Sequence, residues 1–198
     1  MRRQMTVAQY RAIDLTLFAL ILTVTETVIA LAARLWFPGE IYTVSAVAAV
    51  TAIVMARWGP WAAIHAVLGG VVFCRASGAQ PWQYAVYCAG NLLGLGGLFV
   101  IRALGGGEKL RADGLKCVAY AVSVLLMMQL GRAAVSLAFG VSLADAVGFF
   151  ASDVLSLLFT ALIVWIARRQ DGLIENQKRY LLRVAQEFKR EKEDFDER

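Results

Sequence analysis

The chain has 198 residues, of which 59% are hydrophobic, and its formal net charge is +5. This apolar fraction exceeds the roughly 45–50% of an ordinary soluble domain, so the composition argues against a soluble enzyme and favours a membrane protein. The positive charge does not indicate nucleic acid binding, because most lysines and arginines fall in the predicted loops and tail, where they act as topology signals. We therefore expect the lipid bilayer as a partner and no nucleic acid.

Apolar stretches long enough to cross a bilayer recur along the chain. A spanning segment must satisfy its own backbone hydrogen bonds, and the alternation typical of barrel strands is missing, so we expect helices. With roughly twenty residues per crossing, we predict an all-α bundle of six transmembrane helices over residues 1–169 and a cytoplasmic tail over residues 170–198. The predicted spans are Tyr10–Trp36, Ile41–Ala56, Pro60–Ser77, Pro81–Leu104, Leu115–Phe139 and Leu143–Ala167.

The second and third spans are joined by a short sequence that predicts a tight turn. Glycine followed by proline, at Gly59 and Pro60, allows one helix to end and another to begin. Most basic residues lie at the ends of spans on the same side as the amino terminus, and only Arg34 and Arg75 lie at the opposite ends. Both termini are therefore predicted to be cytoplasmic, in a multi-pass protein of the cell membrane.

Ionisable residues inside the predicted spans are the first candidates for a site, because a charge in lipid is costly and normally faces the bundle interior. With the predicted topology most of them, including Arg34 and Asp145, fall in the outer half, close to aromatic residues at the helix ends. This pattern predicts an outward-facing pocket for a small polar or aromatic molecule. The predicted substrate-binding residues are Glu26, Arg75, Trp82, Tyr84, Asn91, Gln129, Arg132 and Asp153.

A structural interpretation of the same residues stays open. Mixed charges can neutralise one another, and an ion pair such as Arg132 with Asp153 would fix the register of two helices without binding any solute. Asp14 and Arg57 are predicted to lie in the inner half, away from the outer residues.

No motif indicates catalysis, a cofactor or a metal. His65 is the only histidine, which excludes a haem held by two histidines, and we interpret it as a hydrogen-bonded packing residue. The cysteines, Cys74, Cys88 and Cys117, lack a paired spacing and are interpreted as small buried hydrophobes. No Walker loop or zinc signature occurs, so we do not expect an enzyme or an ATPase.

Two further segments have patterns typical of helix contacts. Small residues that recur on one face let helices approach closely in lipid, and on the first span they are Ala12, Thr16, Ala19 and Thr23. This face either packs inside the chain or docks a partner. Residues 170–198 alternate apolar and charged positions at helical spacing, which predicts an amphipathic helix that lies on the inner leaflet or recruits a partner.

Six helices with cytoplasmic ends, a length near two hundred residues, the small-residue face of the first span and the run RWGPWAAIHAVLGG at residues 57–70 together resemble a known family. The chain is similar to the substrate-binding S components of energy-coupling-factor transporters. The resemblance implies that it captures a vitamin or similar micronutrient on the outer face. It also implies association with a transmembrane coupling subunit and two ATPases, followed by toppling in the bilayer to release the substrate inside.

The family resemblance also concerns the docking face. In S components an Ala-x-x-x-Ala pair near the start of the first helix contacts the coupling subunit, and the literal match in this sequence is Ala8 with Ala12. This pair lies at the polar edge of the span, so the face continued by Thr16 and Ala19 would have to serve in its place.

Two other functions are alternatives to solute capture. The first is a non-catalytic membrane anchor or assembly subunit, in which the outer charges are structural and the tail recruits a cytoplasmic partner. The second is a small secondary transporter that works alone. It is disfavoured because the sequence indicates neither repeated halves nor broken helices in matched positions.

Overall fold

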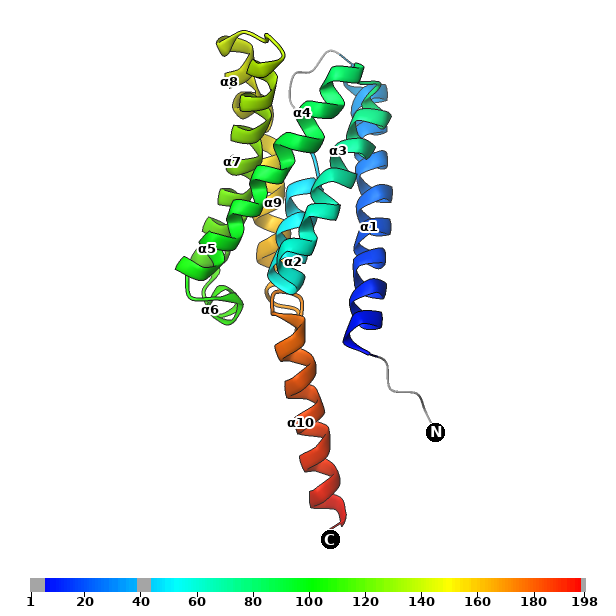
Figure 1. The fold of residues 1–198 in the computed structure, drawn as a ribbon, viewed down its shortest axis with the longest axis vertical. Coiled ribbons are helices and arrows are strands. Elements are labelled where there is room, and N and C mark those ends of the chain that lie inside the picture. The colour runs from blue at the N-terminus through cyan, green and yellow to red at the C-terminus, as the bar shows by residue number, and fades with distance from the viewer. Residues whose placement is uncertain (1–5, 39–43, 197–198) are drawn as a thin grey trace.

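The computed structural model describes residues 6–38 and 44–196, and within these ranges it contains helices and no strands. The long helices form one bundle, and α1 begins at the end of the bundle from which the last helix projects (Figure 1). The elements are α1 (Val7–Trp36), α2 (Val47–Trp58), η1 (Gly59–Ala62), α3 (Ala63–Ser77), α4 (Pro81–Leu92), η2 (Leu93–Gly96), α5 (Gly97–Ala103), α6 (Gly107–Ala112), α7 (Gly114–Ala138), α8 (Leu143–Ser152), α9 (Val154–Ala167) and α10 (Gln177–Asp196).

Several helices are long and apolar enough to cross a membrane. Among the described residues there are four such stretches, or five if the bent pair of α8 and α9 counts as one. This agrees with the prediction of an all-helical, multi-pass membrane protein, whereas the count of six spans and the orientation of the termini stay predictions. The four stretches are Val7–Trp36, Val47–Ser77, Pro81–Ala103 and Gly114–Ala138.

The stretch Val47–Ser77 turns back on itself at the predicted Gly-Pro turn. Gly59 has a φ of 62°, which ends α2, and Pro60 follows in the first turn of η1. A Cβ added to Gly69 would come within 2.6 Å of the Val47 side chain. A straight helix would hold these two residues about 33 Å apart, so α2 and α3 lie antiparallel, as Figure 1 shows.

The short helix α2 forms the centre of the bundle. All its residues from Val47 to Trp58 are buried, against α1, α3, α5, α7 and α9. At 1.5 Å per residue it is about 18 Å long, so it fills only part of the bundle. The prediction of a second helix over Ile41–Ala56 was wrong in its bounds: Val44 to Ala46 are not helical, and residues 41–43 lie outside the described residues.

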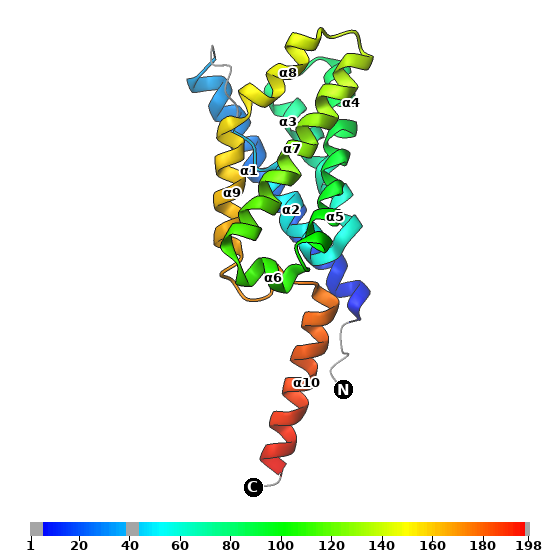
Figure 2. The ribbon, with the colours of Figure 1, turned by 90° about the vertical axis from the view of Figure 1, so that its left-hand side faces the viewer.

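One predicted span contains a 3₁₀ segment, and another is bent. The span that begins at Pro81 passes through the 3₁₀ segment η2, where a Cβ on Gly94 would come within 2.7 Å of the Met128 side chain on α7. The predicted Leu143–Ala167 span bends by 41° at Asp153, between α8 and α9. Figure 2 shows this bend at the end of the bundle far from α10.

The predicted tail helix is present as α10, and its sequence is amphipathic. It extends away from the bundle in both views (Figures 1 and 2). The segment before α10 was predicted as part of the cytoplasmic tail, but it packs against the end of the bundle. Its residues Gly172, Ile174 and Glu175 are buried there. Glu175 also forms ion pairs with Arg111 and Arg183, at 3.7 and 2.9 Å. Packing therefore continues beyond residue 169.

Candidate functional site

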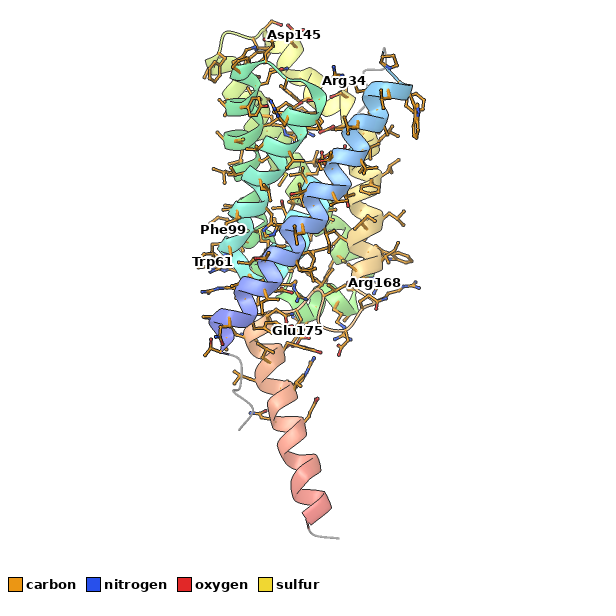
Figure 3. The ribbon with its side chains drawn as sticks, turned by 90° about the vertical axis from the view of Figure 1, so that its right-hand side faces the viewer. Arg34, Trp61, Phe99, Asp145, Arg168 and Glu175 are labelled. Carbon is orange, nitrogen blue, oxygen red and sulfur yellow. The ribbon has the colours of Figure 1, made fainter. Side chains whose placement is uncertain are left out.

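A group of polar side chains is buried inside the bundle, and we call it the polar cluster. It draws on α1, α4, α7, the segment before α2 and the junction between α8 and α9. Figure 3 shows Arg34 and Asp145 at one end of the bundle and Glu175 at the other. The cluster lies in the half of the bundle nearer Arg34 and Asp145. Its member Asp153 immediately precedes α9, and α9 runs from there towards the end that contains Glu175. Its members are Glu26, Ser45, Asn91, Gln129, Arg132 and Asp153.

Arg132 on α7 connects most of the polar cluster. Its side chain is 4% exposed, and Nη1 lies 2.8 Å from Oδ2 of Asp153. Nε donates a hydrogen bond of 2.8 Å to Oδ1 of Asn91, and the Gln129 amide donates to the same Asp153 oxygen. A charge pair in a low-dielectric interior needs such additional hydrogen bonds to offset its desolvation. The ion pair that the sequence left open between Arg132 and Asp153 is therefore present.

Close packing of two glycines brings Asn91 and Arg132 together. A Cβ on Gly131 would overlap the carbonyl oxygen of Gly90, and a Cβ on Gly90 would come within 2.6 Å of the backbone nitrogen of Arg132. Without side chains at these two positions, the backbones of α4 and α7 approach closely. The residues that follow each glycine, Asn91 and Arg132, then meet inside the bundle.

Glu26 contacts the start of α2, whereas the sequence predicted it as a charge partner. Its two carboxylate oxygens accept hydrogen bonds from the Ser45 hydroxyl, at 2.8 Å, and from the backbone N–H of Ala46, at 2.7 Å. The Ser45 hydroxyl in turn accepts from the N–H of Val47 at 3.2 Å. The first amides of a helix have no partner within it, and the helix dipole favours a negative charge there. Glu26 and Ser45 therefore set the residue at which α2 begins.

A small cavity of about 10 Å³ lies against the polar cluster. This volume corresponds to about one water molecule. Tyr87 and Arg132 both line it, with the guanidinium 4.8 Å from the centre of the tyrosine ring. Nη2 of Arg132 donates no hydrogen bond to any residue that the structure describes, so its two N–H donors are available beside the cavity. The lining residues are Ser45, Val47, Gly69, Gly70, Phe73, Tyr87, Asn91, Arg132 and Asp153.

Five of the eight predicted substrate-binding residues meet in the polar cluster, and three of these, Asn91, Arg132 and Asp153, line the cavity. The other three predicted residues lie outside the cluster. Arg75 is exposed in the last turn of α3, and Trp82 and Tyr84 lie in the first turn of α4. Tyr87 provides the aromatic wall because it lies four residues before Asn91 and so shares its helix face. That spacing was the available signal in the sequence. The five that meet are Glu26, Asn91, Gln129, Arg132 and Asp153.

A second buried ion pair lies near the start of α10. Arg57 donates from Nε and Nη2 to the two carboxylate oxygens of Asp14, each at 2.8 Å. The indole N–H of Trp58 donates to the same carboxylate, and Nη1 of Arg57 donates to the carbonyl of Gly172 at 2.5 Å. These contacts join α1, α2 and the segment before α10. The sequence assigned Asp14 and Arg57 to the same side of the membrane but did not pair them.

The interpretations of the histidine and the cysteines agree with the structure. His65 is fully buried, and its Nε2 lies 3.0 Å from the carbonyl oxygen of Leu15 on α1, as expected of a packing residue. Cys74 and Cys117 are buried and Cys88 is half-buried, and all three are free thiols. Within residues 6–38 and 44–196, no three side chains of His, Cys, Asp or Glu are arranged to hold a metal.

The predicted docking face on α1 is partly open. Ala12 and Thr16 are exposed, whereas Ala19 and Thr23 are half-buried. The Thr23 hydroxyl donates to the carbonyl of Ala19 at 2.8 Å, so this hydroxyl is already used within the helix.

Comparisons of the chain with protein-family models, with curated proteins and with solved structures find no match.

Proposed function

We propose that this protein is the substrate-capturing membrane subunit of an uptake transporter of the energy-coupling-factor type. The polar cluster would bind a small polar or aromatic molecule, such as a vitamin, near the outer face. The subunit would then pass this molecule to a coupling subunit driven by two ATPases. The proposal does not require catalysis or a cofactor.

The observation that supports this proposal best is the free side of the Arg132 guanidinium. Asp153 and Asn91 hold its Nη1 and Nε, and Nη2 has no hydrogen-bond acceptor among the described residues. Its two N–H donors lie beside the cavity, where an acceptor atom can reach them. A carbonyl or carboxylate oxygen of a ligand would satisfy this donor, with the ring of Tyr87 beside it.

Binding of a vitamin-sized molecule requires the walls of the cavity to move apart, because about 10 Å³ accommodates only one water. Gly69 and Gly70 form part of this wall and carry no side chain that would fill an enlarged pocket. The arrangement described above then corresponds to a ligand-free subunit whose charges are paired with one another.

Ligand retention tests the proposal directly. Native mass spectrometry of the full chain, purified from its own host, should detect a bound small molecule. Arg132→Ala and Asp153→Ala should each abolish retention, and Arg132→Lys should weaken it, because an ammonium lacks the fork of parallel donors. Arg75→Ala is the matched control, since it removes the same charge from an exposed position outside the cavity.

Two controls make the result decisive. Gel filtration and thermal unfolding should show that each variant is folded. If folded Arg132→Ala and Asp153→Ala both retain the molecule at the wild-type level, the polar cluster is not the binding site.

The projecting helix α10 favours a second candidate, a membrane anchor that recruits a cytoplasmic partner. This helix has an amphipathic sequence and extends beyond the bundle (Figure 1). Because Gln177 is buried and donates to the carbonyl of Gly172, a truncation that begins at Lys178 keeps this contact and leaves Glu175 paired with Arg111. Deletion of residues 178–198 should leave solute retention unchanged in a substrate-capturing subunit and should abolish partner recruitment by an anchor.

A further inference from the structure

A second and larger cavity lies at the end of the bundle where α10 begins. Its volume is about 530 Å³, within the range of roughly 300–1,000 Å³ typical of ligand pockets. It is formed by α1, the turn between α2 and α3, α5 and the start of α10. We call it the basic pocket, because five cationic residues line it: Arg11, Arg57, Arg102, Lys178 and Arg179.

The charges of the basic pocket are largely uncompensated. No aspartate or glutamate is among its lining residues. Arg57 is neutralised by Asp14, but the other four cations form no ion pair with any described residue. Cations gathered in a concave, low-dielectric wall create a strong positive potential. The basic pocket therefore suits an anion with several acceptor oxygens.

The residues around the basic pocket are of the types found at the headgroup level of a bilayer. The Arg11 guanidinium lies 4.4 Å from the ring centre of Trp61, which is 46% exposed at the pocket edge. Tryptophan at the end of an apolar span is typical of the headgroup level. Figure 3 shows Trp61 near the end of the bundle where α10 starts. Leu98 lines the pocket, and the adjacent Phe99 is 72% exposed, so an apolar surface begins beside the cations.

We propose that the basic pocket binds the phosphate of an anionic phospholipid headgroup. Arg102, Lys178 and Arg179 donate to the phosphate oxygens, and the acyl chains leave along the apolar side of α5. A basic pocket between helices at the membrane boundary is a known arrangement for acidic headgroups. The bound lipid thereby connects the bundle with the first turn of α10, because the pocket includes residues of both. This proposal does not depend on solute capture at the polar cluster.

Titration of the delipidated full chain in detergent tests the assignment. The probes are dioctanoyl phosphatidylglycerol, dioctanoyl phosphatidylcholine, inorganic phosphate and a glutamate oligopeptide, with binding followed by calorimetry. The test variant is Arg102→Gln with Arg179→Gln. The control variant is Lys109→Gln with Arg169→Gln, which removes the same charge from exposed positions outside the basic pocket.

We expect saturable binding of phosphatidylglycerol and much weaker binding of phosphatidylcholine. The test variant should lose about thirtyfold in affinity, on the order of fivefold for each cation, and the control variant should bind as the wild type does. Equal loss in both variants, or equal affinity for the two lipids, would overturn the proposal. Inorganic phosphate that binds as tightly as phosphatidylglycerol would overturn the lipid assignment. Binding of the glutamate peptide alone would assign the pocket to an acidic protein segment.

Discussion

The Arg132 guanidinium on α7 lies 2.8 Å from the Asp153 carboxylate at the residue where α8 ends and α9 begins. Both side chains are buried, and Asp153 also accepts from Gln129. The helix axis changes direction at Asp153 and does not continue straight from α8 into α9. The 41° bend and the buried ion pair thus coincide at one residue.

Removing one member of this pair should destabilise the bundle strongly. Asp153→Ala leaves the Arg132 charge buried without its partner, and the expected loss in the free energy of unfolding is about 3–5 kcal/mol. The double variant Arg132→Met with Asp153→Leu should recover most of this loss, because neither residue then leaves its charged partner buried alone. Denaturant unfolding in detergent of Arg132→Met, Asp153→Leu and the double variant measures the coupling. Additive losses would show that the pair is not coupled.

The close approach of α4 and α7 should depend on Gly131. Gly131→Ala places a methyl group onto the carbonyl oxygen of Gly90, so the helices must separate, at a cost of about 1–3 kcal/mol. The matched control is Gly148→Ala on α8, where an added Cβ meets no atom within 4 Å. There alanine should be neutral or stabilising by up to about 1 kcal/mol, because glycine is the poorer helix former. Thermal unfolding of the two variants measures the contrast.

Glu26 should control the start of α2. Glu26→Ala removes the two carboxylate oxygens that accept from the Ser45 hydroxyl and the Ala46 N–H. We expect the free energy of unfolding to fall by about 1–3 kcal/mol and amide exchange at Ala46 and Val47 to become faster. Glu26→Gln keeps one oxygen acceptor and should lie between alanine and the wild type. Hydrogen exchange followed by mass spectrometry reports the local effect. Unchanged exchange over residues 45–48 in Glu26→Ala would contradict this role.

Asp113 should contribute a pH dependence at the start of α7. Its carboxylate accepts from the backbone N–H of Lys116, which is the main cause of its lowered pKa, with further contributions from the N–H of Leu115 and the Lys116 charge. Because the folded pKa lies below the unfolded value, the stabilisation is present above about pH 4 and is lost as the pH falls through the folded pKa. Asp113→Asn should flatten this part of the unfolding midpoint measured against pH.

Local chemistry explains which parts of the fold could be predicted from the sequence. The apolar stretches predicted the helices, because a segment in lipid must satisfy its backbone hydrogen bonds internally, and a helix does so. Gly59 and Pro60 identified the turn, since glycine alone readily adopts its positive φ. The high cost of a buried charge selected Glu26, Arg132 and Asp153 before any contact was known.

Other features were decided by contacts between segments far apart in the sequence. The central position of α2, the bend at Asp153 and the pairing of Asp14 with Arg57 each depend on which helices become neighbours. No periodicity within a single span carries that information. The sequence by itself determined which residues must avoid lipid, through the free energy of burial. Only the tertiary structure decided what each of them meets, because close packing of helices across Gly90 and Gly131 chooses the partners.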